Sequence, residues 1–176
     1  MKPTARSNVY LPMAAMLLTA VLAVPTAAQN QGPFKGTFQG QDAHDTLAPG
    51  ATSVLIRTTA TGVGTHLGRL SCNREITANL LNFTHAGSAH WVAANGDSID
   101  TTVVGQAELS DLPGGFIRVT EIHTIAGGTG RFTGAEGSFT VELFHKLEAS
   151  GVAGGVEAHD IFGSFHGTIT SPGAAH

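Results

Sequence analysis

The sequence predicts an all-β protein whose strands close into a barrel. No segment carries an apolar stripe with a 3.6-residue period over the length of a helix. Instead, runs that alternate apolar and polar residues recur about every ten residues, which is typical of a barrel or a sandwich. The segments 36–40 (GTFQG) and 163–167 (GSFHG) are nearly the same. Their likeness favours the barrel, because glycine-kinked strands suit neighbours at a barrel seam.

Alternation and β-branched content place the expected strands at Phe34–Gln41, Thr52–Thr61, Thr65–Cys72, Asn73–Phe83, Ser88–Ala94, Asp97–Gln106, Phe116–Ala126, Ser138–Lys146 and Ile161–Thr170. Glycine, proline and acidic residues predict loops at Asp42–Gly50, Leu109–Gly115 and Leu147–Asp160. Asn95-Gly96 is the strongest hairpin signal, because both residues tolerate a positive φ. The glycine-rich stretch that follows Ala126 is expected as a turn, with at most one helical turn near 130–135.

The first 28 residues are interpreted as a secretory signal peptide. Lys2 and Arg6 charge its start, and the apolar run Leu11–Val24 is shorter than the roughly 20 residues of a membrane span. Small residues at 25–28 predict cleavage after Ala28. We therefore expect a β-barrel domain at 29–176 in a secreted or periplasmic protein.

Charge and cysteine content narrow the possible partners and cross-links. Residues 29–176 hold seven basic and thirteen acidic residues, a net charge of −6, with no basic run. Nucleic acid and anionic membrane surfaces are therefore not expected partners. Cys72 is the only cysteine, which rules out an intrachain disulfide. We expect it to be a small buried residue at a strand end.

Glycine is the most distinctive residue of the predicted domain. All 23 glycines follow the signal segment, at about twice the usual frequency. They have no strict period and alternate with Thr, Val, Ile and Phe, which excludes collagen and favours short, strongly curved strands.

Four segments together resemble a known family. They are Thr65-His66-Leu67-Gly68, AANGD at 93–97, GGTGRFTGA at 127–135 followed by GSF at 137–139, and GSFHGTI at 163–169. In that order they resemble the secreted bacterial proteins related to the allene oxide cyclase and dirigent barrels. The resemblance implies a single eight-stranded antiparallel, calycin-like barrel with an internal cavity. Plant members cyclise or guide oxidised lipid or phenolic substrates, often as dimers or trimers. The matched positions are glycines and turns, so no catalytic residue is carried over.

Two polar residues stand on the otherwise apolar face of the strand expected at Phe116–Ala126. Glu121 and His123 share that face with Val119 and Ile125 and would lie about 7 Å apart along the strand. A carboxylate beside an imidazole inside a barrel could serve general acid–base chemistry or hold a ligand's polar group. A mutually satisfied buried pair, or the opposite register with both side chains in solvent, is the alternative.

The other histidines give weaker signals. His145 follows Phe139, Val141 and Leu143 on one face, so it is a candidate ligand contact at the cavity rim or else a surface residue at the barrel end. None of the nine histidines has the H-x-x-x-H spacing, and we expect neither a metal nor a cofactor. The glycines near 130 precede a strand and have no Lys-Ser/Thr pair, so they do not predict a phosphate loop.

Three functions stay open at this point. The first is a barrel whose interior binds a small, largely apolar ligand, with Glu121, His123 and His145 as its polar contacts. The second is an isomerase or cyclase acting on an oxidised lipid or phenolic substrate. The third is a structural or surface-interaction protein whose barrel is filled by its own side chains. Cavity volume separates them, since ligand pockets measure roughly 300 Å³ or more.

Overall fold

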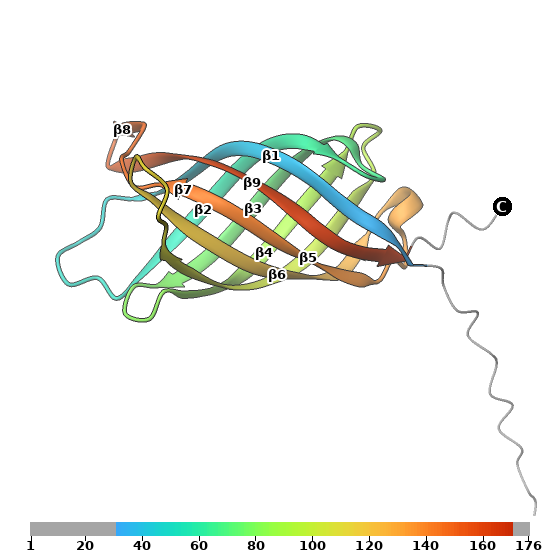
Figure 1. Cartoon of the computed structure of the whole chain (residues 1–176), viewed down its shortest axis with the longest axis horizontal. Coiled ribbons are helices and arrows are strands. Elements are labelled where there is room, and N and C mark those ends of the chain that lie inside the picture. The colour runs from blue at the N-terminus through green and yellow to red at the C-terminus, as the bar shows by residue number, and fades with distance from the viewer. Residues whose placement is uncertain (1–30, 171–176) are drawn as a thin grey trace, which may run out of the picture.

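The protein forms a closed antiparallel barrel of eight strands. The computed structural model describes residues 31–170, so the predicted signal segment 1–28 lies outside the described residues. The barrel strands are β1 (Gln31–Asp45), β2 (Ser53–Gly64), β3 (Gly68–Asn79), β4 (Thr84–Ala93), β5 (Ser98–Leu109), β6 (Phe116–Gly128), β7 (Gly137–Lys146) and β9 (Val156–Thr170). Each strand pairs with the next around the sheet, and pairing of β1 with β9 closes it (Figure 1). The predicted eight-stranded barrel is confirmed.

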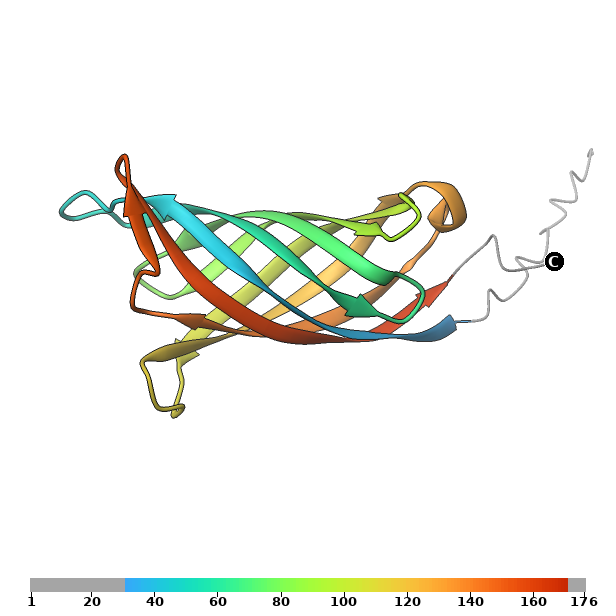
Figure 2. The ribbon, with the colours of Figure 1, turned by 90° about the horizontal axis from the view of Figure 1, so that it is seen from above.

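A ninth strand lies outside the closed ring. The short β8 (Gly151–Ala153) pairs only with the start of β9 and extends one end of the barrel as a hairpin (Figure 2). The far end carries a single 3₁₀ turn, Gly130–Phe132, where one helical turn was predicted. Within residues 31–170, no helix has the length and apolar character that a membrane crossing requires.

The two similar glycine-kinked segments meet at the closing seam, as their likeness predicts. In the β1–β9 ladder, Phe38 lies opposite Gly163 and Gly36 lies opposite Phe165. Directly opposed residues point to the same face of a sheet, so each inward ring faces a glycine on the neighbouring strand. Large and small residues thus alternate across the seam, and the rings can fill the interior.

Gly163 shows why the seam requires glycine. A Cβ at this position would lie 2.4 Å from the carbonyl oxygen of Glu142 and 2.8 Å from the Leu143 Cα on β7. Gly163 therefore lets the backbones of β7 and β9 approach closely between the inward side chains of Phe38 and Leu143. The same arrangement recurs at Gly167, where a Cβ would lie 2.4 Å from the Phe139 Cα.

The glycine-rich stretch between β6 and β7 closes one end of the barrel. Its 3₁₀ turn places the Phe132 side chain in the core with 1 % exposed. The Asp97 carboxylate fastens the turn, accepting a hydrogen bond from the Arg131 backbone at 3.3 Å and lying 3.5 Å from the Arg131 guanidinium. The predicted turn is confirmed.

Aromatic rings fill that half of the barrel. Trp91 stands at the centre with 1 % exposed, and its ring centroid lies between 5.2 and 6.0 Å from the rings of Phe38, Phe139 and Phe165. Cys72 lies opposite Trp91 on the neighbouring strand and is buried, as predicted. Burial raises the pKa of its thiol to about 12, so the thiolate is scarce at neutral pH.

The structure corrects one pair of predicted strands. Thr65–Cys72 and Asn73–Phe83 were expected to be separate, yet most of both ranges forms the single strand β3, with Cys72 near its middle rather than at a strand end. Alternation runs through this strand, since Leu70, Cys72, Arg74 and Ile76 are all buried. An inward arginine interrupts the apolar pattern, which is why one strand resembled two.

Two predicted loops are also partly wrong. Strand β1 continues through the first residues of the loop expected at Asp42–Gly50 and ends at Asp45. The loop expected at Leu147–Asp160 contains β8 and the start of β9, joined by Gly154 and Gly155, which both have positive φ. In both places polar residues face inward, so the apolar alternation that marks a half-buried strand is missing. The loop predicted at Leu109–Gly115 occupies residues 110–115 and is confirmed.

Candidate functional site

Glu121 and His123 both point into the barrel. Both residues are fully buried, and they lie two residues apart on β6. The imidazole donates from Nε2 to Glu121 Oε2 at 3.0 Å. The register expected from the apolar face is therefore the one that the protein adopts.

The pair belongs to a larger set of inward polar residues, which we call the buried polar cluster. Each of the strands β1 to β7 contributes at least one member. The members are Asp42, Thr58, Arg74, His85, Thr101, Glu121, His123 and His145. The cluster thus links seven of the eight barrel strands through side chains alone.

Arg74 is the hub of the buried polar cluster. Its guanidinium donates to Glu121 through Nη1 and to Asp42 Oδ1 through Nη2, the latter at 2.9 Å. Its Nε donates to Thr58 Oγ1 at 2.9 Å, and the Thr58 hydroxyl donates in turn to Asp42. All the hydrogen-bonding nitrogens of the guanidinium therefore have oxygen partners, which is the condition under which a buried arginine is tolerated.

Histidines surround the two carboxylates. His85 on β4 has its Nε2 atom 2.9 Å from Glu121 Oε1. His145 donates from Nδ1 to Asp42 Oδ2 at 3.0 Å. His145, predicted as a rim or surface residue, is 8 % exposed and belongs to the buried polar cluster.

Electrostatics keep both carboxylates ionised. Burial alone would raise their pKa values, but Arg74 together with hydrogen bonds from His145 and Thr58 holds the pKa of Asp42 below its ordinary value. Arg74, with His123 and His85, likewise holds the pKa of Glu121 far below its ordinary value. Carboxylates of this kind are weak proton acceptors at neutral pH.

His123 is held neutral and fully engaged. Burial lowers the pKa of its imidazole, and the bond to Glu121 offsets this only in part. Its Nε2–H donates to Glu121 Oε2, and its Nδ1 accepts a hydrogen bond from the Thr101 hydroxyl, with 3.0 Å between Nδ1 and Oγ1. Neither nitrogen is left to exchange a proton with a substrate.

The space beside the pair is small. The cavity in contact with both Glu121 and His123 measures about 10 Å³ and is also lined by Phe38, Arg74 and Trp91. A single water needs roughly 10–15 Å³. The interior thus holds no more than about one water there, far less than a small organic ligand.

Sequence reasoning found three members of the buried polar cluster and missed the others. Asp42 was assigned to a loop, and Arg74 lay where two strands were separated. The available signal was the continuous period of two through Arg74, which would have placed a charged side chain inward. No local pattern shows that residues 42, 74 and 121 meet, because that depends on the closure of the barrel.

An open groove lies on the outside of the barrel. The groove has a volume of about 790 Å³ and crosses β1, β2, β3, β7 and β9, with Val63, Phe144 and Phe162 among its lining residues. Phe162 packs on Phe144 at 5.3 Å and on Phe116 at 5.6 Å between ring centroids. We call these three phenylalanines the outer aromatic patch; Phe162 is 44 % exposed.

Comparisons with known proteins do not show a family for this chain. The chain matches no protein-family profile and no curated protein. Among solved structures, it is similar to a pterocarpan synthase dirigent protein, with 10 % sequence identity and a TM-score of 0.46 over 82 % of this chain and 94 % of that one. At this identity neither residues nor activity transfer, and the barrel assignment rests on the observed strand pairing.

Proposed function

We propose that this protein is a filled β-barrel that acts through its surface, as a structural or interaction module. The observation that carries the proposal is the interior volume of about 10 Å³ beside Glu121 and His123. A ligand pocket of about 300 Å³ or more would have favoured a carrier or an enzyme. Aromatic rings occupy one half of the interior and the buried polar cluster crosses the other.

The chemistry of the cluster agrees with a structural role. A general base needs an accessible lone pair, and a ligand site needs polar groups without internal partners. Here the Glu121 and Asp42 carboxylates are bound by Arg74 and by histidines, and His123 is bonded at both nitrogens. The cluster therefore fastens seven strands together.

The outer aromatic patch is the surface that best fits a partner. Phe144 and Phe162 stack on each other and line the open groove, and Phe116 packs edge-on against Phe162. Interfaces are enriched in such aromatic residues. The partner would be a second folded protein surface, such as another copy of this chain. Nucleic acid and membranes are not proposed as partners, because residues 29–176 have a net charge of −6 and contain no run of basic residues. The location that we propose is extracellular or periplasmic, after removal of residues 1–28.

Interior binding of a small apolar ligand is the second candidate. The favouring observation is that the small cavity joins apolar rings, Phe38 and Trp91, to the polar pair Glu121 and His123. Such a ligand would have to displace core side chains. An isomerase or cyclase would need the same opening and, in addition, a free proton acceptor.

Native mass spectrometry of protein purified from its own host separates these functions. A filled barrel predicts the mass of the processed chain, or an integral multiple of it, with no organic adduct after gentle desolvation. Solvent extraction should then yield no small molecule in a constant ratio to the protein. A bound organic compound at one per chain, lost on denaturation, would overturn the proposal and support the interior binder.

A further inference from the structure

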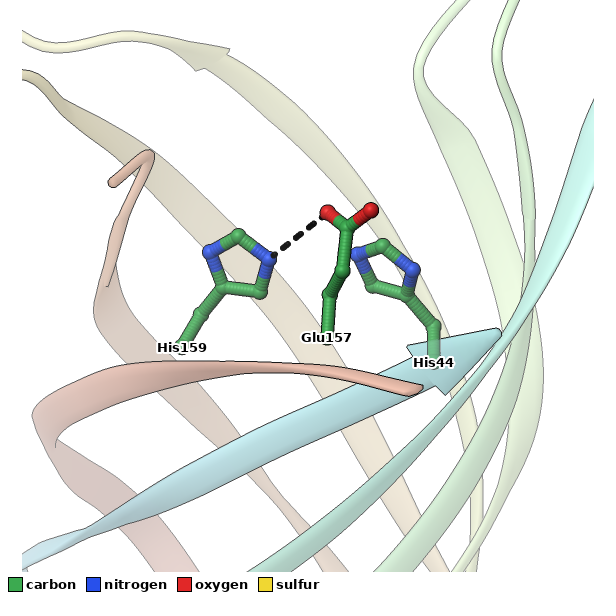
Figure 3. Close-up of side chains that lie close together, drawn as sticks. All are labelled: His44, Glu157 and His159. Carbon is green, nitrogen blue, oxygen red and sulfur yellow. Dashed lines mark ion pairs between the residues drawn. The ribbon is translucent and has the colours of Figure 1, made fainter. Parts of the chain in front are cut away.

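A second group of polar side chains lies at the end of the barrel that carries β8. His44 on β1 and Glu157 on β9 are directly opposed in the ladder, and His159 follows Glu157 by two residues on the same face. Figure 3 shows the Glu157 carboxylate beside both imidazoles. One nitrogen from each ring and one carboxylate oxygen lie within 4.8 Å of one another.

His159 is oriented as a metal ligand would be. Its Nδ1 donates to the carbonyl oxygen of Lys146 at 3.0 Å, which leaves the Nε2 lone pair facing the group. His159 is 5 % exposed, and its Nε2 has no hydrogen-bond partner. A histidine bonded to a backbone carbonyl at one nitrogen and to metal at the other is the common arrangement in metal sites.

The unsatisfied Nε2 is the observation that separates this group from an ordinary polar surface. A buried ring nitrogen without a partner is costly, and native proteins rarely leave one in that state. The nearest acidic atom, Glu157 Oε2, is 3.9 Å away, too far for a hydrogen bond. A cation bound between His159 Nε2 and Glu157 Oε2 would give both atoms a partner.

We propose that His44, Glu157 and His159 bind a zinc ion. Two imidazoles and one carboxylate form a three-residue ligand set that leaves the fourth tetrahedral position to water. Calcium and magnesium are disfavoured because they prefer shells made of oxygen. The ion would join β1 to β9 across the closing seam, and this proposal is independent of what the barrel interior holds.

The geometry requires only modest side-chain movement. Ligand atoms around tetrahedral zinc lie about 3.3 Å apart, given bonds of roughly 2.0–2.1 Å. His159 is fixed by its bond to Lys146 and by stacking on His145, with ring centroids 4.7 Å apart. His44 and Glu157 are half-buried and can close the remaining gap by rotation of their side chains.

Sequence spacing alone does not reveal this site. His44 and Glu157 are far apart in the chain, and the segments that hold them were expected to be loops. Glu157-x-His159 becomes a pair on one face only because β9 starts at Val156. The register of β1 against β9 then supplies the third residue.

Isothermal titration of the chelator-treated, processed protein with Zn²⁺ tests the site. We expect one Zn²⁺ per chain and no displacement by a large excess of Ca²⁺ or Mg²⁺. His159→Gln and Glu157→Gln should each weaken Zn²⁺ binding tenfold or more. Glu157 is partly exposed, so its variant tests the site even if His159→Gln fails to fold.

The matched control is His166→Gln, an exposed histidine on the same strand β9. Its Zn²⁺ affinity and stoichiometry should equal those of the unmodified protein. Co²⁺ substitution gives a second readout, because a tetrahedral nitrogen–oxygen site shows visible absorption that Glu157→Gln should lose. Absence of binding, or an equal loss in His166→Gln and His159→Gln, would overturn the proposal and leave only adventitious binding by surface histidines.

Discussion

At the scale of single residues, Arg74 carries the largest share of the buried polar cluster. Replacing it with methionine would leave Asp42 and Glu121 as buried carboxylates without their cation. Removing one partner of a buried ion pair costs about 3–5 kcal/mol. We therefore expect Arg74→Met to lower the free energy of unfolding by that amount in urea denaturation.

Arg57 provides the matched control for Arg74. It pairs with Glu75 at 3.1 Å, but both side chains are more than half exposed. Exposed pairs contribute about 0–1 kcal/mol, so Arg57→Met should change stability by less than about 1 kcal/mol. Equal losses in the two variants would show that Arg74 is not the hub that its bonds indicate.

The pH dependence of stability reports on His123. Burial lowers the pKa of this histidine in the folded state below its ordinary value of 6.5. Below pH 6.5 the unfolded chain therefore binds a proton at this residue more readily than the folded protein does. The contribution of His123 to the free energy of unfolding is thus fully present above pH 6.5, and it is lost as the pH falls toward the pKa of the folded state. One such group changes stability by at most about 1.4 kcal/mol per pH unit.

His123→Gln keeps a donor for Glu121 and an acceptor for Thr101 but does not titrate. We expect a shallower slope of unfolding free energy between pH 6.5 and 5 than in the unmodified protein, measured by chemical denaturation. At lower pH both proteins should lose stability further, because Asp42 and Glu121 have lowered pKa values and stabilise the fold only while ionised. His166→Gln, at an exposed position, should keep the original slope; an unchanged slope in His123→Gln would refute this assignment.

At the scale of elements, the glycines on neighbouring strands allow the strands to curve around large inward residues. Gly163→Ala would force a Cβ against the Glu142 carbonyl and the Leu143 backbone, neither of which can rotate away. Overpacking of this kind costs about 1–3 kcal/mol. We expect a loss in that range in thermal or urea unfolding.

Gly151→Ala is the corresponding control. A Cβ there would meet no atom within 4 Å, and its φ is not positive. Its stability should stay within about 0.5 kcal/mol of the original. A Gly163→Ala variant as stable as Gly151→Ala would mean that the seam does not need close strand approach.

The same elements show how far sequence can predict this protein. Period-two runs and the repeated glycine segments predict the strands and the closing seam, because local alternation and turn chemistry are sufficient there. Prediction fails where Asp42, Arg74 and His159 face inward, since a buried charge resembles a loop or a break. Glu121 and His123 were found because the residues beside them on β6 are apolar. Their partners depend on barrel closure, which no local pattern encodes.

At the scale of the whole molecule, the barrel is filled by its own side chains. One half holds aromatic rings around Trp91, with Phe132 closing its end, and the other half holds the buried polar cluster. Glycines on neighbouring strands leave room for the inward aromatic rings, and the buried ion pairs hold the strands together. We therefore propose that the protein acts through the outer aromatic patch and the barrel end near β8, not through its interior.

Fluorescence of Trp91 tests the filled interior most directly. Trp91 is the only tryptophan in the chain, and it lines the small cavity that touches Glu121 and His123. If the barrel is filled, the Trp91 emission should be blue-shifted, and acrylamide should quench it no faster than it quenches a fully buried tryptophan. Added apolar compounds should leave the emission unchanged until the protein unfolds. Fast quenching in the native state, or saturable spectral shifts with such a compound, would contradict the filled barrel and show an interior open to ligands.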